Sequence, residues 1–161
     1  MTMIKTSCLL AALAILIGGG RAAAQSTPAT PTVLFVCEHG AAKSVIAAAH
    51  FNPLAKERGL AYRAVARGTA PDAAIPAGVR NGLEAAGLEL VVPNPVMVTT
   101  ADASRANRII TFEIALPTTV SAGSKSVMDW KAVPSVSADF TTASADIKRR
   151  VEALIDELAR K

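Results

Sequence analysis

The sequence predicts a parallel α/β sandwich, and two observations support that prediction. Residues 33–36 form a nearly continuous apolar run, which is typical of a strand buried on both faces of a parallel sheet. Strand-like and helix-like stretches then alternate along the chain, a pattern typical of βαβ units. Ligands bind at the carboxyl ends of the strands in such sheets, so residues that directly follow a predicted strand are candidate functional residues.

Local signals set the expected boundaries of the helices. Pro76 suits a first helical turn, and Gly59 and Gly87 suit positions just past a helix end. Ser144 is the expected N-cap of the last helix, whose apolar side chains recur at helical spacing. We therefore expect strands at 33–36, 61–66, 108–112 and 127–130, helices at 44–57, 76–86, 100–106 and from 144 onward, and a loop at 116–125.

The first residues have the features of a targeting segment. Lys5 precedes a short apolar stretch at 8–17, and three alanines at 22–24 form a cleavage signal. The apolar stretch is too short to span a bilayer, although an uncleaved N-terminal anchor is the alternative. We expect a signal peptide at 1–24, a flexible lead-in at 25–32 and one domain at 33–161. This organisation predicts an exported protein, periplasmic or secreted, with no membrane association after cleavage.

Charge and cysteine content exclude several classes of function. The formal net charge is +4, but Lys5 and Arg21 belong to the targeting segment, and no aromatic residues interleave with the basic ones. Nucleic-acid binding is therefore not expected. Removal of Cys8 with the signal peptide leaves Cys37 as the single thiol. With only two histidines and no second cysteine, no metal site is expected, and no cofactor or protein partner is indicated.

The most informative segment is 37–44, where Cys37 follows a predicted buried strand and precedes a predicted helix. Backbone N–H groups converge in such a turn, and the helix dipole adds positive potential there. This geometry binds a tetrahedral oxyanion and favours the thiolate form of a neighbouring cysteine. The alternative is an inert buried cysteine that fills space at the end of a strand.

Segment 33–44, with its strand, cysteine, five-residue loop, cation and serine, resembles the opening of the low-molecular-weight protein tyrosine phosphatases. It is equally similar to the related thioredoxin-coupled arsenate reductases, whose loop His39 and Ala41 match. Further along the chain, the order and spacing of segments also resemble these families. The similar segments are 67–69, 79–87, 108–112, Trp130 and the last helix, so the resemblance covers 33–161. The resemblance implies a three-layer sandwich with a four-stranded parallel sheet flanked by helices.

The resemblance also implies a mechanism. Cys37 would attack phosphorus as a thiolate, Lys43 would neutralise charge on the bound oxyanion, and Ser44 would donate a hydrogen bond to the sulfur. Ser44 could equally be a plain helix N-cap. His39 could pair with the thiolate or lie on the surface. The residues implied to surround the anion are Glu38, His39, Gly40, Ala41, Ala42 and Lys43, with the Glu38 side chain pointing outward.

Three departures from the family pattern bear on function. Position 43 is Lys where the family has Arg, which binds a tetrahedral anion through two parallel N–H bonds. The Asp-Pro acid of the family falls on 133–134, which carries no carboxylate, and Asp129 and Asp139 flank it as substitutes. No further cysteine follows 108–112 to take part in an internal disulfide relay.

These observations favour an enzyme that hydrolyses a phosphomonoester through a phosphocysteine, as the protein tyrosine phosphatases do. The first alternative is arsenate or related oxyanion chemistry that uses an external thiol. The second is a module that binds phosphate or arsenate without turnover, because an anion-binding loop survives the loss of a general acid.

Overall fold

The computed structural model describes residues 30–124 and 126–160. The predicted signal peptide at 1–24 and most of the predicted lead-in lie outside the described residues. No helix within the two described ranges combines the length and apolar composition needed to cross a bilayer. In chain order the elements are β1 (Thr32–Cys37), α1 (Lys43–Glu57), β2 (Arg63–Gly68), α2 (Ala77–Ala85), α3 (Thr100–Arg105), β3 (Ala106–Thr111), α4 (Thr118–Ser121), β4 (Val127–Asp129) and α5 (Phe140–Ala159).

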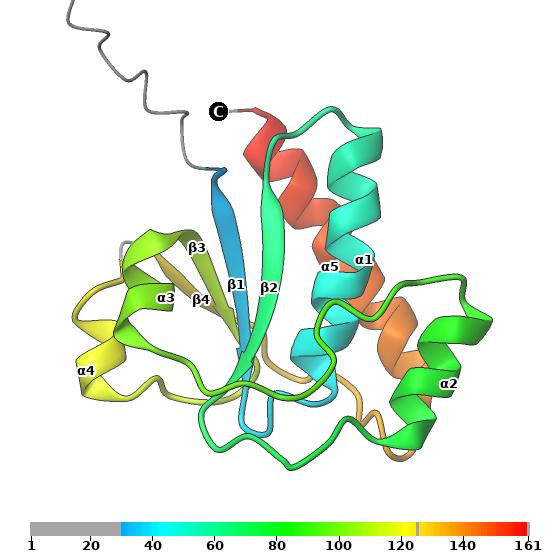
Figure 1. Cartoon of the computed structure of the whole chain (residues 1–161). Coiled ribbons are helices and arrows are strands. Elements are labelled where there is room, and N and C mark those ends of the chain that lie inside the picture. The colour runs from blue at the N-terminus through cyan, green and yellow to red at the C-terminus, as the bar shows by residue number, and fades with distance from the viewer. Residues whose placement is uncertain (1–29, 125, 161) are drawn as a thin grey trace, which may run out of the picture.

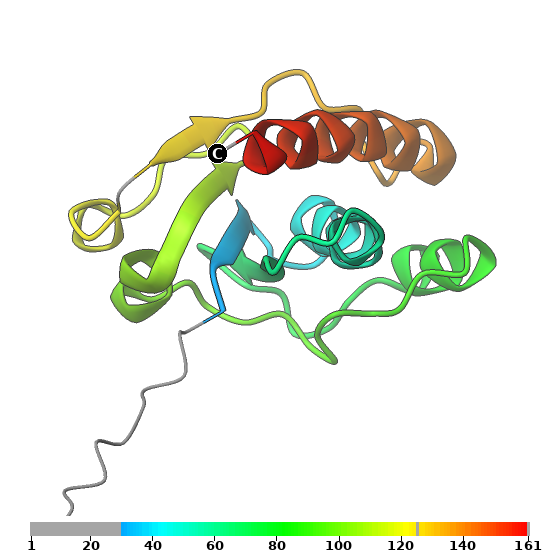
Figure 2. The ribbon, with the colours of Figure 1, turned by 90° about the horizontal axis from the view of Figure 1, so that it is seen from above.

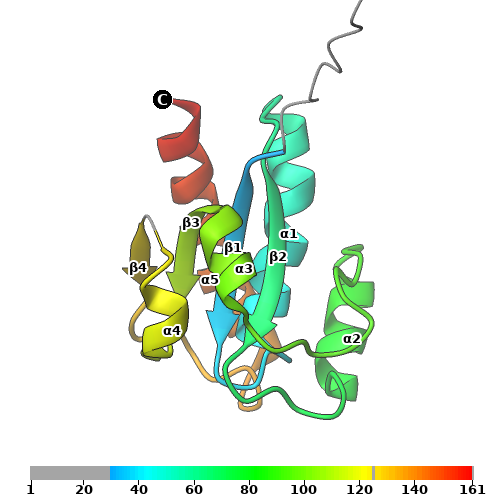
Figure 3. The same cartoon turned by 60° about the vertical axis from the view of Figure 1, so that its left-hand side comes forward.

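The four strands form one parallel sheet in the order β2-β1-β3-β4, which confirms the predicted architecture (Figure 1). β1 lies between β2 and β3 and pairs in parallel with both, while β4 pairs with β3. All four strands therefore point the same way, and their carboxyl ends meet at one edge of the sheet (Figure 3). The loop between β1 and α1 lies at this edge.

Helices cover both faces of the sheet, with α1 and α5 side by side on one face and α3 and α4 on the other (Figure 2). Side chains of β1 alternate between two apolar clusters, as the two-residue period of a strand requires. Val33 and Phe35 pack in the cluster that contains residues of α1 and α5. Leu34 and Val36 pack with residues of α3 and α4. All four are fully buried, which confirms the prediction of a strand covered on both faces.

The last helix begins earlier than predicted. α5 starts at Phe140 rather than near Ser144, because Asp139 supplies the N-cap and its carboxylate accepts the backbone N–H of Thr142 at 3.1 Å. Ser144 is instead buried within the helix, where its hydroxyl lies 2.8 Å from Nε2 of His50. Serine and aspartate are both good N-caps, and the residues after either one suit a helix.

Smaller differences concern the loops. The stretch at 116–125, predicted as a loop, contains the short helix α4. β2 runs two residues further toward its carboxyl end than predicted and includes Gly68, which also bridges to Met97. α1 continues through Pro53 to Glu57, and Gly59 follows its end at a positive φ of 68°. A positive φ suits glycine just past the end of a helix.

Candidate functional site

Cys37 is the last residue of β1, and its thiol lies beside the first turn of α1. Sγ of Cys37 is 3.1 Å from Oγ of Ser44, close enough for a hydrogen bond in either direction. Ser44 is fully buried and Cys37 is 8% exposed. A serine hydroxyl in this position can donate to a thiolate and stabilise the charged form of the sulfur.

Cys37 lines a pocket with a volume of about 500 Å³ at the carboxyl edge of the sheet. The loop after β1 forms one side of it, and segments that follow β2, β3 and β4 form the others. Its lining residues are Cys37, Glu38, His39, Ala41, Ala42, Lys43, Asp72, Pro76, Phe112, Glu113, Ile114, Val133, Ser135, Val136 and Ser137. The structure therefore brings the predicted loop residues to one cavity, apart from Gly40.

The loop at 38–42 is held by its carbonyl groups and keeps its N–H groups available. The carbonyls of Cys37, Glu38 and His39 accept hydrogen bonds from backbone N–H groups of the segment that follows β2. By contrast, the backbone N–H groups of 38–42 donate to no other residue of the described chain. Consecutive unpaired N–H groups at the start of a helix form an anion-binding concavity.

Two glycines allow this loop to lie against the end of β2. Gly40 has a positive φ of 61°, and a Cβ at this position would meet the nitrogen of Gly68 at 2.7 Å. A Cβ on Gly68 would meet the nitrogen of Gly40 at 2.6 Å. Real Cβ atoms do not approach so closely, so the path of the loop depends on the absence of a side chain at both positions.

Lys43, the cation that the resemblance assigns to the oxyanion, is already paired. Its Nζ lies 3.1 Å from Oε2 of Glu113 and 3.0 Å from the carbonyl oxygen of Val133. The lysine side chain is 23% exposed and that of Glu113 is 45% exposed. The positive charge beside the loop is therefore balanced by a carboxylate from the segment after β3.

Glu113 occupies a backbone position that non-glycine residues seldom adopt, with a φ of 56°. Its N–H donates to Oδ1 of Asp129 at 2.8 Å, and its Oε1 accepts the N–H of Ala132 at 3.1 Å. The hydrogen bond from Lys43, followed by the one from the Ala132 N–H, holds the pKa of Glu113 below its ordinary value. Sequence reasoning did not select Glu113, although it follows a predicted strand and so lies at the ligand-binding edge.

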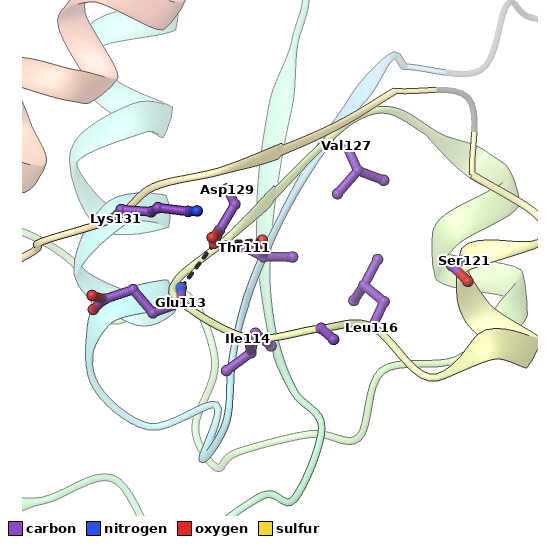
Figure 4. A pocket seen from close by; sticks show the side chains of 9 residues that line it. Thr111, Glu113, Ile114, Leu116, Ser121, Val127, Asp129 and Lys131 are labelled. Carbon is purple, nitrogen blue, oxygen red and sulfur yellow. Dashed lines mark hydrogen bonds between the residues drawn. The ribbon is translucent and has the colours of Figure 1, made fainter.

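The two aspartates predicted as substitute acids are engaged elsewhere. Oδ1 of Asp129 accepts the hydroxyl of Thr111 as well as the N–H of Glu113. Asp129 lines a second pocket of about 670 Å³ near α4, and not the one that contains Cys37 (Figure 4). Asp139 caps α5, and hydrogen bonds from Thr142 lower the pKa of its carboxyl. A catalytic role for either aspartate remains a prediction.

His39 lies at the rim of the pocket and is paired with a carboxylate that sequence reasoning missed. Its Nδ1 is 3.1 Å from Oδ1 of Asp72, in the segment after β2, and its Nε2 is 3.7 Å from Oε2 of Glu38. All three residues line the pocket. The imidazole thus lies between two carboxylates, of which Asp72 is the nearer and can orient the ring.

The geometry thus provides a thiol, a row of free backbone donors and an oriented imidazole around one cavity. Apolar surface on the wall of this cavity comes from Pro76, Ile114 and Val136. The arrangement can bind an oxyanion next to a nucleophilic sulfur, which is the chemistry of covalent transfer to cysteine.

Comparison with known proteins gives a structural likeness without a close relative in sequence. Neither a protein-family model nor a curated protein matches the chain. A low-molecular-weight protein tyrosine phosphatase from T. tengcongensis matches with a TM-score of 0.70 at 14% identity, over 79% of this chain and 99% of that one. An arsenate reductase from Archaeoglobus fulgidus matches with a TM-score of 0.60 at 29% identity, over 77% and 98% of the two chains.

A thioredoxin-dependent arsenate reductase from Corynebacterium glutamicum matches with a TM-score of 0.63 at 22% identity, over 80% of this chain but only 61% of that chain. An arsenate reductase solved in its phosphate-binding state is also similar, with a TM-score of 0.66 at 18% identity over 79% of this chain and 98% of that one. The protein therefore has the α/β fold of the low-molecular-weight phosphatases and arsenate reductases, and at least one protein of this fold binds phosphate.

Proposed function

We propose that this protein is a cysteine-dependent enzyme that hydrolyses a phosphomonoester through a phosphocysteine at Cys37. The observation that carries the proposal is the 3.1 Å contact between Sγ of Cys37 and Oγ of Ser44, beside a loop whose backbone N–H groups are unpaired within the described chain. A stabilised thiolate and an anion-binding loop are the two parts that such a reaction needs.

The reaction proceeds in two displacements. The Cys37 thiolate attacks phosphorus, the S–P bond forms, and the bond between phosphorus and the ester oxygen breaks. Water then attacks phosphorus, the S–P bond breaks, and phosphate and the thiolate are released. The N–H groups of 38–42 hold the non-bridging oxygens in both steps, and Ser44 stabilises the sulfur as nucleophile and as leaving group.

The departing ester oxygen needs a proton, and His39 is the group that we propose supplies it. Asp129 and Asp139 do not line this pocket, and the bonds that lower the pKa of Glu113 keep its carboxyl ionised. His39 lines the pocket with its Nδ1 held by Asp72. The imidazolium donates its proton to the ester oxygen, and the neutral imidazole then removes a proton from the attacking water.

The lining also bears on the substrate class. Pro76, Ile114 and Val136 provide apolar surface for the carbon part of an ester. The carboxylates of Glu38, Asp72 and Glu113 surround the same space and repel further negative charge on the leaving group. We therefore propose a phosphomonoester with an uncharged, partly apolar leaving group, such as an aryl phosphate.

Arsenate chemistry with an external thiol is the second candidate. The pairing of Lys43 with Glu113 favours it. A lysine held by a carboxylate is less able to stabilise the transition state of ester cleavage, and arsenate reduction includes no such step. Arsenate would bind the same loop, and the external thiol would supply the electrons, since Cys37 is the only cysteine of the described residues.

We further propose that the protein is exported, with the signal peptide at 1–24 removed. The support is the order of Lys5, the apolar stretch and the small residues at 22–24. The mass of the N-terminal peptide of protein recovered from cells tests this proposal. A mature N-terminus at Gln25 is the expected result, and a retained N-terminus would contradict cleavage.

Steady-state hydrolysis of p-nitrophenyl phosphate by the reduced full chain tests the phosphatase proposal. We expect turnover in the wild type and none in Cys37→Ser, which replaces sulfur by oxygen at nearly the same size. A wild-type rate no higher than that of Cys37→Ser would overturn the proposal. Arsenate-dependent oxidation of an added thiol and binding of inorganic phosphate would then separate the reductase from a module that only binds the anion.

A further inference from the structure

We propose that Glu113 sets the anion affinity of the Cys37 pocket by holding the ammonium group of Lys43. An incoming oxyanion would then have to compete with a carboxylate that the protein itself supplies. This inference rests on the proposed function, because it concerns the oxyanion that the same loop binds.

The contacts of Lys43 support this competition. An ammonium group has three N–H donors, and the structure directs two of them to Oε2 of Glu113 and to the carbonyl of Val133. One donor remains for an anion on the loop that Lys43 terminates. Glu113 and a bound anion would share the one positive charge of Lys43. The hydrogen bond between Lys43 and Glu113 must therefore lengthen if the ammonium group moves toward the anion.

Hydrogen bonds to the backbone on both sides of the carboxylate fix the position from which Glu113 reaches Lys43. Glu113 and Ala132 both have positive φ, 56° and 54°, and the N–H of Ala132 donates to the Glu113 carboxylate. The N–H of Glu113 is itself bound to Asp129. Such backbone conformations have a cost that the surrounding contacts must offset, and they occur frequently at functional sites. Asp129 is thus a positioning residue for Glu113.

The consequence is a pocket with little net attraction for anions. Glu113 cancels the charge of Lys43, and Glu38 and Asp72 line the same cavity. Binding then depends on the neutral backbone donors of 38–42, which discriminate by geometry more than by charge. A neutral side chain at position 113 would release the lysine charge to the ligand.

Calorimetric titration of the reduced full chain with inorganic phosphate tests the inference. Glu113→Gln keeps the shape and removes the charge, and its single amide oxygen can accept from Lys43 or from the Ala132 N–H, which in the wild type donate to different carboxylate oxygens. We expect it to bind phosphate about five- to tenfold more tightly than the wild type, a gain typical of removing one like charge near a ligand. In a Lys43→Met background the same substitution should change affinity by less than about twofold.

Glu38→Gln is the matched control, because it removes a carboxylate of the same pocket that does not contact Lys43. An equal gain in phosphate affinity in Glu38→Gln and Glu113→Gln, or a gain that persists with Lys43→Met, would overturn the inference. Such a result would mean that any loss of negative charge from the pocket raises the affinity, whether or not the carboxylate contacts Lys43. Phosphate binding that Glu113→Gln leaves unchanged overturns the inference alone. No phosphate binding by any of these proteins would overturn the proposed function as well.

Discussion

Gly40 and Gly68 contact each other backbone to backbone, so that a Cβ added to either would lie within 2.7 Å of a nitrogen of the other. The contact joins the loop after β1, the proposed anion-binding loop, to the carboxyl end of β2. Three hydrogen bonds continue the junction, from the N–H groups of Thr69, Ala70 and Asp72 to carbonyls of 37–39. The path of the loop is therefore fixed by its neighbour strand and not only by its own residues.

Gly68→Ala should damage both the fold and the pocket. The new methyl would lie 2.6 Å from the Gly40 nitrogen and 2.9 Å from the Glu38 carbonyl oxygen, so the loop must move. We expect the free energy of unfolding to fall by about 1–3 kcal/mol and phosphate binding to weaken. Urea denaturation and calorimetry measure the two effects. Gly78→Ala is the control, because nothing lies within 4 Å of its added Cβ, and it should be as stable as the wild type or up to about 1 kcal/mol more stable, since Gly78 lies in α2.

Ser44→Ala should lower turnover while leaving the chain folded. Loss of the hydroxyl removes the contact with Cys37 Sγ, and with it the hydrogen-bond donor that the proposed mechanism gives to the sulfur. We expect the rate of p-nitrophenyl phosphate hydrolysis to fall by about ten- to a hundredfold. Ser144→Ala removes another buried hydroxyl, one that contacts His50, and should cost about 1 kcal/mol of stability without changing turnover. Equal rates in the two variants would rule out a role for Ser44 in the reaction.

The effect of Asp72→Asn on the rate of hydrolysis should depend on the leaving group of the ester. If Asp72 orients His39 as proton donor, its loss matters most when the leaving oxygen is strongly basic. We expect a loss of less than about threefold with p-nitrophenyl phosphate and of about ten- to a hundredfold with phenyl phosphate. Asp129→Asn, which acts through Glu113, should change both rates by the same factor. A selective loss with phenyl phosphate in Asp129→Asn would instead favour Asp129, one of the two aspartates that the sequence offers as a substitute acid.

His50 should make stability depend on pH. Burial, together with the nearby charge of Lys148, lowers the pKa of His50 from its ordinary value near 6.5, while Glu152 opposes the shift. The unfolded chain therefore binds the proton of His50 more readily than the folded chain does. The contribution of neutral His50 to the free energy of unfolding is complete above about pH 6.5, and it is lost as the pH falls through the lower pKa of the folded state. Urea denaturation between pH 5 and 8 should show this loss, and His50→Gln should reduce it. If His39→Gln reduced the loss as much, the assignment to His50 would be wrong.

The architecture and the place of the candidate nucleophile in the fold could be predicted because their signals are local. The apolar run before Cys37, the cysteine itself and Ser44 lie within one short segment, and the strand–loop–helix geometry follows from that order. Burial of β1 on both faces and the parallel sheet of four strands confirm that prediction. Local signals failed where two residues compete for one role, as Asp139 and Ser144 do for the N-cap of α5.

The rest of the site depends on pairs that are distant in sequence. Lys43 meets Glu113 across 70 residues, and His39 meets Asp72 only because β2 pairs with β1. No spacing rule connects such residues before the order of the strands is known. A useful signal was present, since Glu113 directly follows a predicted strand, and in a parallel sheet every such position lies at the same edge.

The pocket depends on the shortest strand of the sheet. β4 has three residues, all exposed, and pairs only with β3, yet the segment after it supplies Ala132 to Glu113 and the Val133 carbonyl to Lys43. Exposed edge segments open more easily than a sheet core. Detachment of β4 would therefore remove the contacts of Ala132 with Glu113 and of Val133 with Lys43, and so open one side of the Cys37 pocket. The geometry of the pocket around Lys43 thus depends on the pairing of a short edge strand with β3.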